Sequence, residues 1–223
     1  MNTRGWPCPL PDGGSVEEHA LAFDDFRRCR LLIVPALFDE ANRMRRFTVE
    51  VMRRLDLSGI DCVLPDLPGN NESLQLLELQ TPDLWRGAML AAAKHFRASH
   101  VLSIRGGALV TPPGLPTWHY APVKGASQLR TMLRARILSS REAGITESQE
   151  DLLKQGLQHG IELSGYRLGP AFVQQFQPLV PAEATVIDQD MLGGSGLWLR
   201  AEPGEDRAQA DALAAVLAIG IKS

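Results

Sequence analysis

The residues best placed to do chemistry lie in the run Ser103-Ile104-Arg105-Gly106-Gly107, which continues an apolar stretch. A β-rich run that ends in paired glycines predicts a strand, a sharp turn and the start of a helix. At this turn stands Arg105, whose guanidinium stays charged at ordinary pH and therefore cannot act as a nucleophile. Its charge would lie beside the N–H groups of the helix start, where a cation needs a compensating anion.

Two sources of that anion are open. One is a ligand, whose carboxylate or phosphate would be bound by Arg105 together with the backbone amides of Gly106 and Gly107. The other is an internal carboxylate, for which four residues near predicted strand ends are candidates: Asp39, Glu40, Asp66 and Asp188. The sequence therefore predicts an anion at Arg105 without saying whether a ligand provides it.

Other side chains with catalytic or metal-binding chemistry are scattered. His119 could line the same edge of the sheet or be a surface or partly buried residue, and Ser103 is expected to point into the layers. No group of His, Cys, Asp and Glu has the spacing of a metal site, so we expect no metal. Gly106-Gly107 fits neither nucleotide-binding glycine motif, and we expect no cofactor.

Composition excludes several classes of protein. The 223 residues are 44% hydrophobic and 22% charged, as in ordinary globular proteins, with a net charge of -3. That charge argues against a nucleic-acid binder, and no apolar run is long enough for a membrane span. Three scattered cysteines and the lack of a secretory signal predict reduced thiols in a cytoplasmic protein.

Short apolar runs predict strands at residues 30–36, 60–64, 100–104, 118–123, 184–187 and 197–200, with a strand or hairpin arm at 161–168. Apolar spacing and capping signals predict helices at residues 40–56, 84–97, 127–142, 146–157, 170–177 and 206–219. This alternation indicates an α/β fold with three layers, α/β/α, around a doubly wound, mostly parallel sheet.

The two ends of this pattern are less regular. Three prolines in residues 112–116 limit the helix after Gly107 to about one turn. Residues 1–28 are interpreted as a leader packed on a single domain of residues 29–223. Within it, alternating prolines make Trp6–Pro11 irregular, and residues 15–28 are expected to hold a short helix.

Five motifs follow one another in a recognisable order: Val34–Arg43, Leu64–Gly69 followed by Ser73, Ser103–Leu109, Pro122–Gly125 and Gly165–Ala171. Together they resemble the α/β-hydrolase superfamily, and within it the group called exosortase A system-associated hydrolase 2. The resemblance implies a reduced α/β-hydrolase-like fold, with residues 37–43 as the former oxyanion loop. It also implies a bacterial protein linked to exopolysaccharide and protein-sorting gene clusters. Relative to that group, the N-terminal strand pair is expected to be lost.

In α/β-hydrolases, the superfamily that this chain resembles, the serine of the elbow motif G-x-S-x-G is the nucleophile. An acid and then a histidine follow it along the chain. Arg105 occupies the serine position, and Asp188 or Asp190 lies near the acid position. The last histidine is His159, so none falls in residues 197–204, where the catalytic loop is expected. Two of the three triad roles are therefore unfilled.

The sequence thus favours a pseudo-hydrolase that binds an anionic small molecule or a partner. The candidate ligand-binding residues share the predicted carboxyl edge of the sheet: Arg105, Gly106, Gly107, Phe38, Asp39 and Asp66. For the loop 37–43, the alternative is a capped helix start with Asp39 as N-cap. The alternative function is an atypical hydrolase, in which Asp188 or His119 assists a water that Arg105 orients. A subunit of a homo-oligomer or other assembly is a third possibility.

Overall fold

The computed structural model describes residues 1–222. The strands are β1 (Asn2–Pro9), β2 (Ser15–Phe23), β3 (Arg30–Val34), β4 (Asp61–Pro65), β5 (His100–Ile104), β6 (Thr117–Tyr120), β7 (Ile161–Leu163), β8 (Tyr166–Leu168) and β9 (Thr185–Ile187). The helices are α1 (Asp39–Leu57), α2 (Pro82–His95), α3 (Gly125–Glu142), α4 (Gln149–His159), α5 (Pro170–Phe176), α6 (Gln189–Leu192) and α7 (Arg207–Lys222). Three single turns of 3₁₀-helix are η1 (Leu77–Leu79), η2 (Arg105–Leu109) and η3 (Leu197–Leu199).

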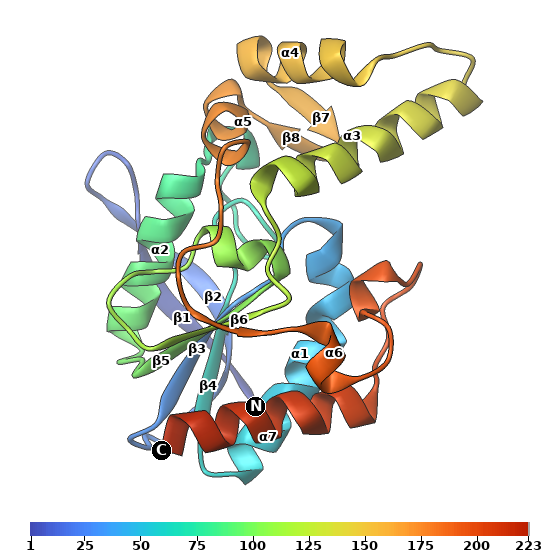
Figure 1. The fold of residues 1–223 in the computed structure, drawn as a ribbon. Helices are drawn as coiled ribbons and strands as arrows, with labels where there is room; N and C mark the ends of the chain where they lie inside the picture. Colours follow the sequence, from blue (N-terminus) through green and yellow to red (C-terminus); the bar gives the residue numbers. More distant parts are fainter. Residues whose placement is uncertain (223) are drawn as a thin grey trace.

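A seven-stranded sheet in the order β1-β2-β4-β3-β5-β6-β9 forms the centre (Figure 1). All neighbours from β4 to β9 run parallel, whereas β1 and β2 are antiparallel additions at one edge. The central strands are apolar because helices cover both faces: α1 and α7 pack on one face, α2 and the segment around α5 on the other. The predicted three-layer, mostly parallel architecture is confirmed.

The N-terminal segment differs from its prediction. Residues 1–28 contain no helix; β1 and β2 form a hairpin that extends the sheet, so the strand pair expected to be lost is present. Trp6 and Cys8 are buried, while Pro7 and Pro9, which alternate with them, are exposed. Proline is tolerated on an edge strand because it removes only an N–H that has no ladder partner. The alternating prolines therefore mark an edge strand, and our prediction of irregular structure there was wrong.

An insertion between β6 and β9, made of α3, α4, the β7–β8 hairpin and α5, lies beyond the carboxyl edge of the sheet (Figure 1). We call residues 125–176 the cap. The helices and the hairpin predicted here are all present, within a few residues. The strand predicted at residues 197–200 is instead the turn η3, which packs against the face that α1 covers. None of the helices in residues 1–222 has the length and apolar character that a bilayer-spanning segment requires.

Candidate functional site

The turn after β5 has the backbone geometry of an elbow. Arg105 has a φ of 52°, in the left-handed region that costs a non-glycine residue about 1–2 kcal/mol. Gly107 follows two residues later, where a Cβ would lie 2.3 Å from the carbonyl oxygen of Pro35, the residue after β3. Only glycine lets the chain turn so close to the neighbouring strand. A helix of about one turn was predicted after Gly107; the structure has the short 3₁₀ segment η2, which begins two residues earlier, at Arg105, and ends at Leu109.

Arg105 is held by three different groups. Its Nε and Nη2 donate to the two carboxylate oxygens of Glu40, each at 3.0 Å, and its Nη1 donates to the carbonyl oxygen of Ala121 at 2.8 Å. The guanidinium carbon lies 4.0 Å from the ring centre of Trp198, in the geometry of a cation–π contact. The Arg105 and Glu40 side chains are only 14% and 18% exposed. Among the four internal carboxylates that could have compensated Arg105, the structure pairs it with Glu40.

Gln128 on α3 fills the space beside the elbow. Its side-chain oxygen lies 2.1 Å from the position that a Cβ on Gly106 would take, and its Nε2 donates to the carbonyl oxygen of Leu37 at 3.2 Å. The Gln128 oxygen is buried and has no hydrogen-bond partner within residues 1–222. The amide therefore lies between the turn after β5 and the loop after β3.

A cleft of about 290 Å³ opens over Arg105, between the sheet edge and the cap. Its walls come from the start of α1, the elbow, one side of α3, the β7–β8 turn and η3. The lining residues are Leu37, Phe38, Asp39, Glu40, Arg43, Arg105, Gln128, Thr131, Met132, Ala135, Ser164, Trp198 and Leu199. Polar and apolar groups are mixed, as in clefts that bind small organic molecules.

Phe38 and Asp39, from the loop 37–43, both line this cleft. Phe38 has a φ of 56° and occupies the N-cap position of α1, so Asp39 is the first helical residue and not the N-cap. The Phe38 ring packs edge-on against Tyr166 and Phe172. Burial raises the pKa of Tyr166, and the Asp39 carboxylate near its hydroxyl raises it further.

The two other aspartates lie apart from Arg105. Asp66 is buried just after β4, where it accepts hydrogen bonds from Asn71 at 2.7 Å and Arg45 at 3.3 Å. Asp188 follows β9, is exposed, and its side chain has no hydrogen bond or ion pair within residues 1–222. Neither carboxylate lines the cleft.

His119 is fully buried within the sheet layers. Its Nε2 lies 3.2 Å from the Thr111 hydroxyl, which lies 2.7 Å from that of Ser103, and its Nδ1 has no partner within residues 1–222. Burial lowers the pKa of His119, so the ring is neutral near pH 7. His119 does not line the cleft, and Ser103 points into the layers as expected. No group of His, Cys, Asp and Glu within residues 1–222 could hold a metal ion.

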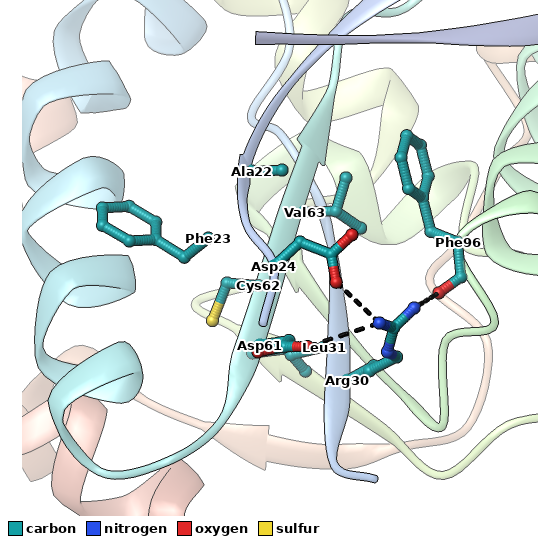
Figure 2. Close-up of a pocket in the computed structure, with 9 residues that line it drawn as sticks. All are labelled: Ala22, Phe23, Asp24, Arg30, Leu31, Asp61, Cys62, Val63 and Phe96. Carbon is teal, nitrogen blue, oxygen red and sulfur yellow. Dashed lines mark hydrogen bonds and ion pairs between the residues drawn. The ribbon is translucent and has the colours of Figure 1, made fainter. Parts of the chain in front are cut away.

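A second hollow, at the opposite edge of the sheet where β3 and β4 begin, is structural (Figure 2). Its volume is about 10 Å³, which is room for roughly one water molecule. Arg30 donates to Asp24 at 2.6 Å and to the carbonyl oxygen of Phe96 at 2.8 Å, and lies 3.5 Å from Asp61. The charges that line it are paired with one another, which leaves none for a ligand.

Two residues of the cleft had no signal in the sequence. Trp198 lies in a stretch that was predicted to be a strand, and nothing in its surroundings indicates contact with Arg105. Gln128 lies in the first turn of α3, an ordinary amphipathic helix in the sequence, and its role depends on the position of the cap. The one hint in the sequence was the absence of histidine from the segment after β9. Without a catalytic histidine there, another side chain of that segment is free to cover the elbow.

Comparisons with known proteins bear on the fold. No protein-family model matches the sequence, and no curated protein matches it. Among solved structures, the chain is similar to mouse alpha/beta hydrolase domain-containing protein 10, with a TM-score of 0.58, 11% identity, and coverage of 100% of this chain and 99% of that one. It is also similar to proline iminopeptidase from Mycobacterium smegmatis, with a TM-score of 0.53, 13% identity, and coverage of 99% and 98%.

A third similar structure, Rv0554 from Mycobacterium tuberculosis, has a TM-score of 0.52 and 10% identity over 83% of this chain and 79% of that one. In two other matches the chain spans less of the known protein: 60% of a structure from Agrobacterium vitis and 54% of the DcsB complex with its substrate analogue. At these identities the similarity establishes the fold and no activity. The strand order, the elbow and the first three of these structures together show that the chain has the α/β-hydrolase fold.

Proposed function

We propose that this protein is a non-catalytic member of the α/β-hydrolase fold whose cleft binds a small molecule. The observation that carries the proposal is Arg105 at the elbow. The strained backbone that would present a nucleophile is kept, but the side chain is a guanidinium bound by Glu40, Ala121 and Trp198. A cation held in this way has no lone pair with which to attack a substrate.

Two neighbours of Arg105 support the proposal. Hydrolases of this fold take their oxyanion-hole donors from the residue after the nucleophile and from the loop after the third strand. Here the Gln128 amide fills the space between Gly106 and Leu37, in those two segments. Trp198, from the chain after β9 where a catalytic histidine would be expected, stacks on Arg105 instead.

The alternative of an atypical hydrolase has less support. It requires Asp188 or His119 to activate a water molecule that Arg105 orients. His119 is buried beneath the turn η2 and its neighbour Thr111, and Asp188 is exposed outside the cleft. Neither could pass a proton to a water held near Arg105 without a change in the fold.

The test combines a covalent probe with turnover. The protein is incubated with a fluorophosphonate and its intact mass measured, alongside hydrolysis of a panel of aryl esters, with an active serine hydrolase as the positive control. We expect neither an adduct nor turnover. An adduct on one serine, or turnover that disappears in Arg105→Ala while the variant stays folded, would refute the proposal.

Several expectations from the sequence stay predictions. These are the partner protein or homo-oligomer, the cytoplasmic location, and the link to exopolysaccharide and exosortase gene clusters that the resemblance implies. The anionic character of the ligand was expected because of Arg105, but Glu40 already neutralises that residue. If the ligand is an anion, another cation has to bind it.

A further inference from the structure

The cleft contains a second arginine, Arg43, in the second turn of α1. One of its guanidinium nitrogens donates to the carbonyl oxygen of Trp198 at 3.0 Å, and it forms no ion pair with any carboxylate of residues 1–222. A guanidinium has five N–H donors, so most of those on Arg43 are available to a ligand. Arg43 lines the cleft, and the other arginines of α1 do not. Those others all have carboxylate partners: Arg45, Arg46, Arg53 and Arg54.

The charges around Arg43 leave it as the anion-binding group. Glu40 is neutralised by Arg105 through two hydrogen bonds. The remaining carboxylate of the cleft, Asp39, lies near the Tyr166 hydroxyl and forms no ion pair with Arg43. A carboxylate that enters the cleft would therefore meet Arg43 without having to displace an existing ion pair.

The rest of the cleft limits the body of the ligand. Met132, Trp198 and Leu199 provide an apolar surface, and Leu199 is exposed at the rim. The volume of about 290 Å³ is roughly twice that of a cavity of about 150 Å³ that binds benzene. One ring or a short alkyl chain, carrying one acidic group, fits this space.

We infer that the cleft binds a small organic carboxylate, with its acidic group on Arg43 and its apolar body against Trp198 and Met132. This inference rests on the proposed binding function and names its ligand class. It assigns the anion to Arg43 and leaves Arg105 with Glu40. The bond between Arg43 and the Trp198 carbonyl also holds the wall against which the ligand body packs.

The experiment compares an acid with its neutral counterpart. 3-Phenylpropionate and 3-phenylpropionamide are titrated into the full-length protein, with binding followed by calorimetry and by the NMR signal of the Trp198 indole. We expect the acid to bind, to shift that signal, and to bind at least about tenfold more tightly than the amide. Arg43→Gln should abolish this preference, so that acid and amide bind with equal affinity.

Arg46→Gln is the matched control, because it removes the same charge from the same helix. Arg46 is 61% exposed, pairs with Glu205 at 3.0 Å and lies outside the cleft. Equal losses in both variants, or equal binding of acid and amide by the unmodified protein, would overturn the inference while the proposed function stands. Failure of both probes to bind would count against the inference and the proposed function together.

Discussion

The contact between Arg105 and Glu40 predicts a measurable coupling free energy. The perturbations are Arg105→Ala, Glu40→Ala and the double variant, which together form a double-mutant cycle. Arg105→Ala removes two charge-assisted hydrogen bonds, the bond to Ala121 and the contact with Trp198, and leaves Glu40 unpaired. For a pair that is less than a fifth exposed, we expect a loss of about 3 kcal/mol in the free energy of unfolding.

Glu40→Ala should cost less, about 2 kcal/mol, because Arg105 keeps Ala121 and Trp198. The double variant should lose about 1–2 kcal/mol less than the sum of the two single variants. The cycle cancels the favourable effect of an acidic residue in the first turn of α1, which both Glu40 variants lose equally.

Urea unfolding, followed by far-UV circular dichroism and tryptophan fluorescence, provides the four free energies. The m-values must agree among the variants for the comparison to hold. Arg105→Gly is the control for backbone strain: at a φ of 52° it should be about 1 kcal/mol more stable than Arg105→Ala. A coupling free energy below about 0.5 kcal/mol would show that the two residues act independently and would refute the pairing.

Three further predictions follow from burial and close contacts. Gly107→Ala should destabilise the protein by more than about 2 kcal/mol, because the new Cβ meets the backbone of the neighbouring strand, whereas Gly87→Ala, in open space on α2, should stabilise it by about 0.5–1 kcal/mol. Equal effects of the two substitutions in thermal unfolding would contradict this prediction. Burial lowers the pKa of His119 below its unfolded value near 6.5, so the free energy of unfolding should be highest above that pH and fall by up to about 1.4 kcal/mol per pH unit on acidification. His119→Gln should reduce this slope, and His100, whose pKa is also lowered by burial, should account for the slope that remains. Cys29, the partly exposed thiol, should react first with Ellman's reagent. Cys8 and Cys62, which are buried and whose pKa values are raised by burial, should react only after unfolding, and equal reaction rates for all three thiols would refute this assignment.

The sequence predicted the centre of the fold well because strands covered on both faces are continuous apolar runs. β3 and β5 are of this kind, and the turn at Gly106-Gly107 follows from glycine chemistry. The β1–β2 hairpin could not be predicted from the same signal. An edge strand tolerates Pro7 and Pro9, which in a central strand would break the ladder.

The site was predicted in part, for a different reason. The parallel strands bring Arg105 and the start of α1 to the same edge, so an internal acid was a reasonable expectation. Glu40 can be chosen among the four carboxylates only if the direction of each side chain is known. A shift of one residue in the start of α1 would turn a different side chain toward Arg105. Trp198 and Gln128 reach the cleft from segments placed only by tertiary packing, and no local pattern encodes that.

The position of α7 has a consequence for synthesis of the chain. Helix α1 packs against α7, and the two share one apolar cluster on the same face of the sheet (Figure 1). About 150 residues separate the end of α1 from the start of α7, and the ribosome needs roughly 8–30 seconds to add them. During that interval the part of α1 that contacts α7 is uncovered, so the nascent chain exposes apolar surface there. A chain truncated before α7 would keep that surface exposed and should aggregate.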